Sequence, residues 1–355
     1  MKIISIVGAR PQFIKCASVS KELRINNHEI LIHTGQHYDY EMSKLFFDQL
    51  HIPEPDFNLG IGSASQDEQI GKMLTKLEKI LKNEKPDIVL VYGDTNSTLA
   101  GASASAKQNI PLAHIEAGLR SFDRTMPEEI NRIVADHVSD YLFVPTKTAI
   151  NNLKKEGIIE GVFLVGDVMY DILLQNNKIF KKSQILKKLD IKPKEYFLAT
   201  IHRQSNTDNI IKLSNILESF SSSNKKIVFP IHPRTEDFIK KHALRKKIGK
   251  NVCIIKPVSY FDFIWLEINA KKILTDSGGI QKEAYLLKVP CITLRENTEW
   301  IETIKDGWNT LVGTHKQKIL YAMNNFKPNG KQSNHFGKGD ASKKIVKILG
   351  EYRVN

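Results

Sequence analysis

Acidic side chains follow short apolar runs in the first half of the chain. They are Asp94 after Ile88–Tyr92, Glu116 after Leu112–Ile115, and the pair Glu128-Glu129 soon afterwards. Acid/base catalysis needs carboxylates whose pKa values are separated by burial and by neighbouring charges. Each acid by itself could equally well cap a helix or pair with an arginine such as Arg132. Taken together, the acids indicate an acid/base site.

Histidine and arginine occur together after two apolar runs in the second half. His202-Arg203 follows Phe197–Ile201, and His232-Pro233-Arg234 follows Ile227–Ile231. Such pairs could neutralise a diphosphate and protonate a departing oxygen. A lone histidine is more often structural, so the pairs gain weight only from their shared position at predicted strand ends.

Two glycine turns stand before predicted helices. Gly8-Ala9-Arg10-Pro11, with Lys15 one helical turn later, could bind an anion at a helix N-terminus. Thr275-Asp276-Ser277-Gly278-Gly279 leads into a helix with Glu283, which could accept both hydroxyls of a ribose. The sequence contains neither GxGxxG nor GxxxxGK[ST], so dinucleotide-binding and P-loop classes lose support.

The elements that must position these residues are apolar strands alternating with helical segments, the pattern of doubly wound parallel sheets. The other predicted strands are Ile3–Val7, Ile30–His33, Tyr141–Val144, Phe163–Val165, Val252–Ile255, Lys272–Thr275, Cys291–Leu294 and Thr310–Val312. We therefore expect an α/β fold with two Rossmann-like domains, residues 1–175 and 190–335, joined by a lysine-rich stretch from Gln175 to Lys194. We expect residues 336–355 to form a helix that packs on the first domain. Ligands bind outside the carboxyl ends of such strands, so two facing domains would form one cleft.

Composition limits the class of partner and the compartment. The 355 residues carry a net charge of +13 with a pI near 9.4, which favours an anionic partner. The lysine runs are typical of solvated surface, so they do not indicate nucleic-acid binding. The three cysteines form no CxxC pair, and no apolar run resembles a signal peptide or a membrane span. We expect a cytoplasmic protein with no structural metal and no contact with membranes.

The motifs together closely resemble the non-hydrolysing UDP-N-acetylglucosamine 2-epimerase family, nearly from end to end. They are GARPQFIK from Gly8, TGQH from Thr34, YGDTNSTLAG from Tyr92, HIEAGLRSFDRTMPEEINR from His114, HR at His202, HPR at His232 and TDSGGIQKEA from Thr275. This resemblance implies a GT-B fold with the substrate in the interdomain cleft, a homodimer, and no metal or nicotinamide cofactor. It also implies C2 inversion of a UDP-N-acetylated sugar through loss and return of UDP, for cell-surface polysaccharide precursors.

The resemblance assigns roles by motif position. Catalytic roles fall to Asp94, Glu116, Glu128 and His202. UDP contacts fall to Arg10, Lys15, Ser277, Gly278, Gly279 and Glu283, with Phe263 lining the base, and we add Arg132, His232 and Arg234 to the substrate-binding residues. Where relatives read TERPE, this chain reads Thr298-Glu-Trp300-Ile-Glu302, so a substrate-site arginine is replaced by Trp300.

Trp300 leaves two substrates open: UDP-N-acetylglucosamine, converted to its manno epimer, and UDP-2,3-diacetamido-2,3-dideoxyglucuronate. Three other functions remain as alternatives. A GT-B glycosyltransferase would need an acceptor pocket where the first-domain acids stand, and a hydrolysing epimerase has a different opening motif. A basic nucleic-acid-binding protein would explain the charge but not the acids, and its binding would depend steeply on salt.

Overall fold

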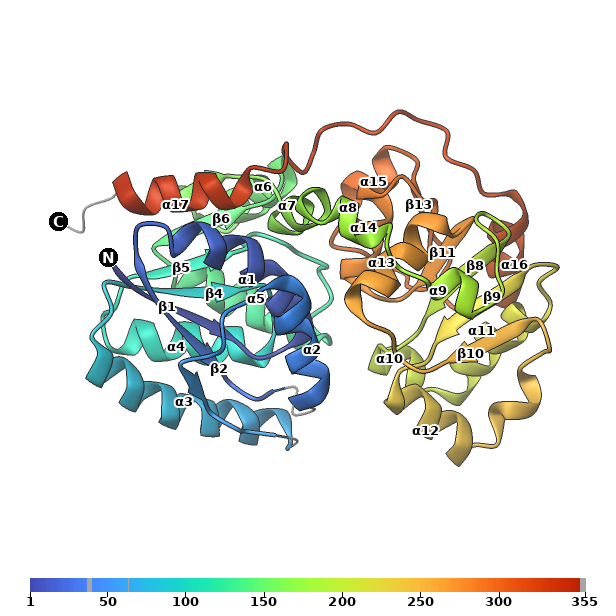
Figure 1. The fold of residues 1–355 in the computed structure, drawn as a ribbon, viewed down its shortest axis with the longest axis horizontal. Helices are drawn as coiled ribbons and strands as arrows, with labels where there is room; N and C mark the ends of the chain where they lie inside the picture. The colour runs from blue at the N-terminus through green and yellow to red at the C-terminus, as the bar shows by residue number, and fades with distance from the viewer. Residues whose placement is uncertain (37–39, 63, 352–355) are drawn as a thin grey trace. The chain divides into compact units, whose positions relative to one another are not determined.

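The chain forms two compact units. A computed structural model describes residues 1–36, 40–62 and 64–351 (Figure 1). Unit 1 contains Met1–Asn176 and Asn334–Asn355, and unit 2 contains Asn177–Ser333. The chain thus leaves unit 1 one residue after Gln175, where the lysine-rich stretch begins. His37 of the TGQH motif lies outside the described residues.

Within the described residues, the strands of unit 1 form one sheet in the order β3-β2-β1-β4-β5-β6-β7, and each neighbouring pair is parallel. The strands are β1 (Lys2–Val7), β2 (His28–His33), β3 (Phe57–Asn58), β4 (Ile88–Tyr92), β5 (Leu112–Ile115), β6 (Tyr141–Val144) and β7 (Val162–Leu164). The order reverses between β1 and β4, which makes the carboxyl ends of these two strands the switch point where doubly wound sheets bind ligands.

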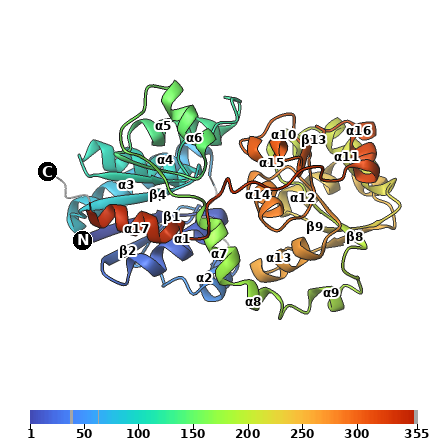
Figure 2. The ribbon, with the colours of Figure 1, turned by 90° about the horizontal axis from the view of Figure 1, so that it is seen from above.

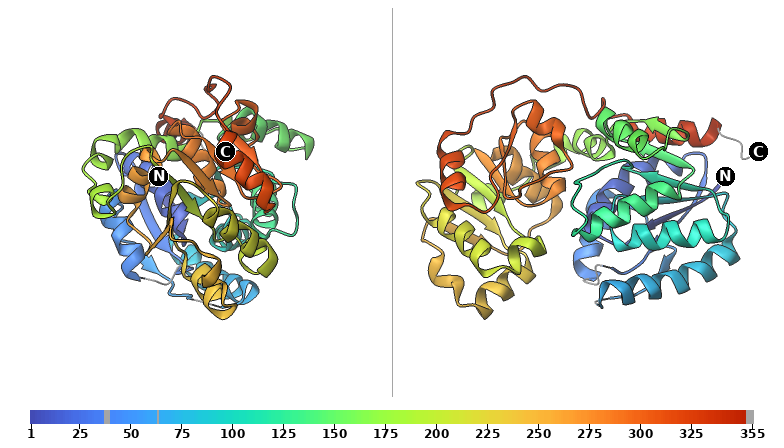
Figure 3. Two further views of the ribbon diagram at one scale, coloured as in Figure 1. Left: turned by 90° about the vertical axis from the view of Figure 1, so that its right-hand side faces the viewer. Right: turned by 180° about the vertical axis from the view of Figure 1, so that it is seen from behind.

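Helices cover the sheet of unit 1. They are α1 (Arg10–Leu23), α2 (Tyr40–Leu50), α3 (Gln66–Glu84), α4 (Asn96–Lys107), α5 (Pro127–His137), α6 (Lys147–Lys155), α7 (Val168–Gln175) and α17 (Ala341–Glu351). Figure 3 shows α3, α4 and α5 side by side on one face, where Met73, Leu77 and Leu81 of α3 are fully buried. These residues recur every four positions, which is the spacing of one helix face.

The C-terminal helix α17 packs on unit 1 against α1 and α7 (Figure 2). The Asp171 carboxylate caps its first turn by accepting from the Ala341 and Ser342 amides at 3.2 and 2.7 Å and from the Ser342 hydroxyl at 2.7 Å. Burial raises the pKa of Asp171 above its usual value. An acidic side chain therefore holds the end of the chain on the first unit.

Unit 2 contains a second parallel sheet, in the order β10-β9-β8-β11-β12-β13 among the described residues. The strands are β8 (Tyr196–Thr200), β9 (Lys226–Pro230), β10 (Val252–Ile255), β11 (Lys272–Thr275), β12 (Cys291–Thr293) and β13 (Asn309–Leu311). Both sheets are doubly wound, which confirms the predicted α/β class with two Rossmann-like domains.

Helices also cover both faces of the second sheet. They are α8 (Asn177–Phe180), α9 (Ile185–Lys188), α10 (Gln204–Thr207), α11 (Ile210–Ser221), α12 (Pro233–Lys241), η1 (Leu244–Lys247), α13 (Tyr260–Asn269), α14 (Gly278–Leu286), α15 (Ile301–Lys305) and α16 (Lys316–Asn325). One core joins the strands to α11, α12 and α16, and a second joins them to α9, α13 and α14. The sheet is therefore buried on both sides, as its continuous apolar strands predict.

Candidate active site

Asp94 lies in the turn after β4 and is held by Arg132 of α5. The Nη2 and Nε atoms of Arg132 lie 2.6 and 3.1 Å from Asp94 Oδ2. The arginine side chain is 2% exposed, whereas the aspartate side chain is 27% exposed. A buried guanidinium thus fixes the orientation of a carboxylate that remains accessible to solvent.

Glu116 follows β5 and pairs with Lys15 of α1. Its backbone has a φ of +73°, in the left-handed region that a residue with a Cβ rarely adopts. The Lys15 ammonium directly contacts Glu116 Oε2, and both side chains are more than nine-tenths buried. A Cβ added to Gly93, beside Asp94, would lie 2.7 Å from Lys15 Nζ. The ammonium that the resemblance assigns to UDP is therefore paired with a carboxylate, between the ends of β4 and β5.

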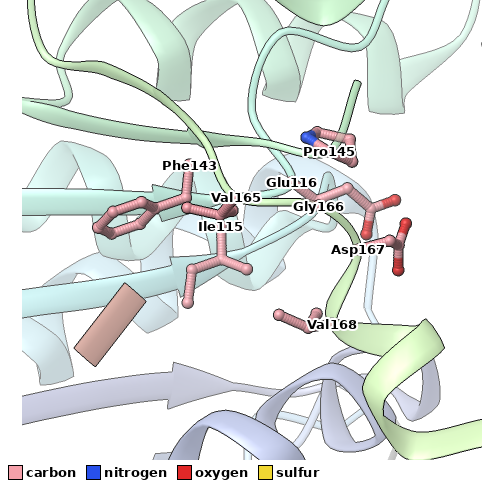
Figure 4. A pocket seen from close by; sticks show the side chains of 8 residues that line it. All are labelled: Ile115, Glu116, Phe143, Pro145, Val165, Gly166, Asp167 and Val168. Atoms are coloured by element: carbon pink, nitrogen blue, oxygen red, sulfur yellow. The ribbon is translucent and has the colours of Figure 1, made fainter. Parts of the chain in front are cut away.

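A small pocket opens beside Glu116, at the carboxyl ends of β5, β6 and β7 (Figure 4). Its lining residues are Ile115, Glu116, Phe143, Pro145, Val165, Gly166, Asp167 and Val168. Asp167 caps α7 by accepting from the Met169 amide at 2.8 Å, and its own amide donates to the Phe336 carbonyl at 3.0 Å. The segment that leads into α17 therefore packs against a wall of the pocket that contains Glu116.

A buried ionic network connects the strand ends behind these acids. His114 Nδ1 lies 2.7 Å from Asp136 Oδ1, and its Nε2 lies 2.7 Å from the Gly93 carbonyl. Arg120 Nη1 lies 2.6 Å from Asp136 Oδ2. Burial raises the pKa of Asp136, but the charges and hydrogen bonds of His114 and Arg120 outweigh burial and keep that pKa below its usual value. The network fixes the turns that carry Asp94 and Glu116.

The structure separates the two glutamates that the sequence presents together. Glu129 is 1% exposed and accepts from the Ser121 amide at 2.9 Å, the Phe122 amide at 2.8 Å and Arg132 Nη1 at 2.7 Å. It therefore holds the loop before α5. Glu128 is only partly buried on the same turn, which leaves it as the one of the pair that is accessible to a ligand.

Asp136 was not among the predicted site residues, although Glu129 and Arg132 of the same helix α5 were. Glu129, Arg132 and Asp136 lie at intervals of three and four residues, so they share one helix face. A stripe with this spacing is normally apolar. Charged residues in its place are the signal that could have revealed the network in advance.

Arg10, at the first position of α1, lies over the ring of Phe46, with its guanidinium carbon 4.9 Å from the ring centroid. The side chain is half-buried. The ring thus restrains a cation at the N-terminus of α1, close in sequence to Gly8 and at the carboxyl end of β1.

In unit 2, Asp276 fixes the turn that carries His202. Asp276 is fully buried and accepts from the His202 amide at 3.1 Å, from the Arg203 amide at 3.1 Å and from Asn206 Nδ2 at 3.1 Å. The His202 side chain is 37% exposed. The histidine is therefore held through its backbone, and its partly exposed ring has Nδ1 3.7 Å from Asp276 Oδ1.

His232 lies near His202, with ring centroids 6.0 Å apart. Its Nδ1 accepts from the Arg234 amide at 3.2 Å and so caps α12, which leaves the proton of a neutral ring on Nε2. The guanidinium of Arg234 pairs with Asp208, whose pKa is lowered by this hydrogen bond. Two histidines and one arginine thus gather at the carboxyl ends of β8 and β9.

The turn Ser277-Gly278-Gly279 begins α14 at the carboxyl end of β11. The Ser277 hydroxyl accepts from the Ile280 amide at 3.5 Å, which makes serine the N-cap. Gly279 is exposed, whereas Gly278 is buried against Glu299. Glu283 is 4% exposed, and its Oε1 accepts from the Tyr260 hydroxyl at 3.4 Å. The helix has nine residues and exposes Gly279 in its first turn, so its N-terminus is suited to a phosphate group.

Phe263 and Trp300 both lie inside unit 2. Phe263 is 5% exposed and belongs to the core between α13 and the sheet. Trp300 is 1% exposed, and Lys282 Nζ lies 4.4 Å from its ring centroid. Glu299 pairs with Arg295, with Oε2 and Nη2 2.9 Å apart. A Cβ added to Gly278 would lie 3.6 Å from Trp300 Nε1, so the tryptophan packs beside the glycine turn.

Neither a metal-binding cluster nor a membrane-spanning helix is found in the described part of the chain. No group of three or more histidine, cysteine, aspartate or glutamate side chains there is arranged to hold a metal ion. No helix among those residues has the length and apolar character that crossing a membrane requires.

Comparison with known proteins identifies the family. The model of the UDP-N-acetylglucosamine 2-epimerase family matches residues 21–350. The chain is 60% identical over 354 residues to a UDP-N-acetylglucosamine 2-epimerase homolog of Methanococcus maripaludis, which covers 98% of this chain and 99% of the relative. It is 44% identical over 360 residues to the UDP-2,3-diacetamido-2,3-dideoxy-D-glucuronate 2-epimerase of Pseudomonas aeruginosa, covering 98% of this chain and 99% of that enzyme.

Solved structures agree with the sequence comparison. The crystal structure of Methanocaldococcus jannaschii UDP-GlcNAc 2-epimerase in complex with UDP-GlcNAc and UDP superposes with a TM-score of 0.94 at 48% identity, covering 99% of this chain and 100% of that chain. A UDP complex of Os79 from O. sativa shares the fold alone, with a TM-score of 0.68 at 10% identity. The matches at high identity cover nearly the whole of both chains, so this protein belongs to the UDP-N-acetylglucosamine 2-epimerase family.

Proposed function

We propose that this protein is a non-hydrolysing epimerase that inverts carbon 2 of a UDP-linked 2-acetamido sugar. The observation that carries the proposal is the pair of carboxylates at the ends of β4 and β5. Asp94 and Glu116 are each held by a buried cation, Arg132 and Lys15 respectively. The family to which the chain belongs gives this arrangement its reaction.

In the proposed reaction a carboxylate removes the proton from C2 while the C1–O bond to UDP breaks. The C2–H electron pair becomes the C1=C2 double bond of a 2-acetamidoglucal, and UDP leaves with the C1–O pair. Protonation of C2 on the opposite face and return of UDP to C1 complete the inversion. Inversion needs proton transfer on both faces of C2, which is the reason for proposing several acids, Asp94, Glu116 and Glu128.

We assign UDP to the carboxyl edge of the second sheet. The first turn of α14, where Gly279 is exposed, would bind the diphosphate, and Glu283 would accept from the ribose hydroxyls. A leaving diphosphate requires positive charge and a proton, and in this proposal they come from His202, His232 and Arg234. Phe263 is proposed to line the base and Trp300 to shape the turn.

The sugar is one of the two that relatives are named for. A relative named a UDP-N-acetylglucosamine 2-epimerase homolog is 60% identical, a relative named UDP-N-acetylglucosamine 2-epimerase is 49% identical, and the relative named for UDP-2,3-diacetamido-2,3-dideoxy-D-glucuronate is 44% identical. Enzymes named for either sugar thus match over nearly the whole chain, so both sugars belong in the assay. We further propose a cytoplasmic homodimer that uses no cofactor and binds no nucleic acid, on the strength of the family resemblance. Light scattering after gel filtration tests the dimer.

Proton NMR in D₂O tests the reaction. The protein is incubated separately with each of the two nucleotide sugars. Deuterium at C2 together with a manno product is expected from the true substrate, because the C2 proton exchanges with solvent during inversion. The absence of exchange with both sugars would overturn the proposed function.

A matched pair of variants tests the role of the strand-end acids. Asp94→Asn is expected to bind UDP normally but to lose C2 exchange. Asp140→Asn is the control. Asp140 directly precedes β6, at the amino ends of the strands and away from Asp94, and accepts from the Leu112 amide at 2.8 Å. Equal turnover by both variants would remove Asp94 from the catalytic role.

A further inference from the structure

Phe122 occupies an unfavourable position for an aromatic residue. It lies in the loop between β5 and α5 with a φ of +59°, in the left-handed region that bulky side chains rarely adopt. The residue is 74% exposed, the highest value among the exposed large hydrophobic residues that the structure describes. Neither its backbone nor its side chain is therefore in the state that folding alone would favour.

A buried carboxylate holds this residue in place. Glu129 Oε1 accepts from the Phe122 amide at 2.8 Å, while Glu129 Oε2 accepts from the Ser121 amide and hydroxyl, both at 2.9 Å. Glu129 is 1% exposed, so these hydrogen bonds are protected from water. The left-handed conformation of Phe122 is thus maintained because the buried Glu129 carboxylate would lose hydrogen bonds if the loop relaxed, and that loss costs free energy.

The same carboxylate connects the loop to Asp94. Glu129 Oε2 lies 2.7 Å from Arg132 Nη1, and Arg132 Nη2 lies 2.6 Å from Asp94 Oδ2. Three consecutive polar contacts therefore join the Phe122 backbone to the proposed catalytic carboxylate. Because Glu129 and Arg132 are both almost fully buried, the fold fixes the Phe122 backbone relative to Asp94.

We infer that Phe122 is a specificity-determining residue whose ring contacts the hexose of the bound UDP-sugar. The inference rests on the proposed function. Asp94 acts at C2 of the hexose in that proposal, and the Phe122 backbone is linked to Asp94 through Glu129 and Arg132, so we place the exposed side chain of Phe122 on the hexose and not on the uridine. A hexose presents C–H groups on one face, and an aromatic ring provides an apolar surface for them at low conformational cost.

Two substitutions of Phe122 test this assignment with the UDP-sugar that the wild-type protein converts. Phe122→Ala removes the ring, and Phe122→Gly also removes the backbone strain. We expect both to raise KM for the UDP-sugar about tenfold, equivalent to about 1.4 kcal/mol. We expect the Kd for UDP alone, measured by calorimetry, to stay unchanged. The melting temperature should be retained in Phe122→Ala and raised in Phe122→Gly.

The matched control is Ile159→Ala, since Ile159 is 69% exposed on the same unit but lies after α6. Its KM should equal that of the wild type. Loss of melting temperature in Phe122→Gly would instead show that the ring supports the fold.

Three further results would overturn the inference. An unchanged KM in both Phe122 variants would exclude a sugar contact. A Kd for UDP that weakens as much as KM would assign the ring to the uridine. A change of molar mass in light scattering would assign it to a contact between protein copies. Failure of the proposed function is a separate result, since the wild type would then show no C2 exchange with either sugar.

Discussion

Gly278→Ala is the change whose cost follows most directly from the structure. A Cβ at this position would lie 2.0 Å from Glu299 Oε1 and 3.6 Å from Trp300 Nε1. Glu299 is 5% exposed and pairs with Arg295, so its carboxylate can move only by giving up that ion pair. The added methyl group therefore forces a rearrangement in a packed region.

The expected magnitude combines two opposing effects. Overpacking a well-packed site costs about 1–3 kcal/mol. Alanine gains at most about 1 kcal/mol over glycine from helix propensity, and less in the first turn of a helix. Separation of Glu299 from Arg295 would add to the cost, because one buried charge would lose its partner. We expect a net loss of about 1–3 kcal/mol in the free energy of unfolding, measured by urea denaturation.

Gly279→Ala is the matched control. Its Cβ would meet only Ser277 Oγ, at 3.9 Å, among the neighbours within 4 Å, so the same chemical change one residue later meets open space. We expect unchanged or slightly increased stability. If the amides of this turn bind the diphosphate, Gly279→Ala should still weaken UDP binding in calorimetry, because the exposed methyl group keeps phosphate from the backbone. Equal stability of the two variants would refute the packing argument, and unchanged UDP binding by both would refute the phosphate assignment.

Three further predictions concern charged groups outside the substrate contacts. Asp136→Asn should lower the free energy of unfolding by about 3 kcal/mol, because His114 and Arg120 lose a buried partner. Since the pKa of Asp136 is lowered in the folded state, the stability that its carboxylate contributes should be lost as the pH drops below about 4. Denaturation curves of variant and wild type should therefore converge at low pH. Asp171→Ala should remove the cap of α17 at a cost of about 1 kcal/mol, seen as faster amide exchange in residues 341–351, and unchanged exchange there would refute the capping role. Burial and the neighbouring lysines lower the pKa of Lys272 to about 8. Between pH 8 and pH 10 the unfolded state therefore binds more protons than the folded state, and the free energy of unfolding of the wild type should rise relative to that of Lys272→Met. A difference in free energy between the two proteins that stays constant over this range would contradict the argument.

The strands could be predicted from the sequence because parallel strands buried on both faces are continuous apolar runs. Ile88–Tyr92, Leu112–Ile115 and Tyr141–Val144 have the predicted bounds, as do Val252–Ile255 and Lys272–Thr275. The other predicted strands differ from the observed ones by one residue at one or both ends, except Ile30–His33, which in the structure begins two residues earlier, at His28. Phe57–Asn58 was missed, because a strand of two residues shows neither an apolar run nor alternation.

The positions of the acids and histidines could also be predicted from the sequence, because these residues follow the carboxyl ends of the predicted strands. In parallel sheets the chain order places every strand end on one edge, so residue position along the chain is enough to group them. The sequence also carried the family, since motifs such as HIEAGLRSFDRTMPEEINR depend on residue order alone.

Only the tertiary structure decided which charge meets which. Lys15 and Glu116 are far apart in the chain, and their pairing depends on the depth of α1 against the strand ends. The same holds for Asp94 with Arg132. Burial was equally out of reach of the sequence, because Glu129 is of a type that is usually exposed and Trp300 was predicted to face the substrate, whereas neighbouring elements cover both. Residue order determines at which end of the strands a side chain lies. Its partner and its exposure depend on how helices and strands far apart in the sequence pack against one another.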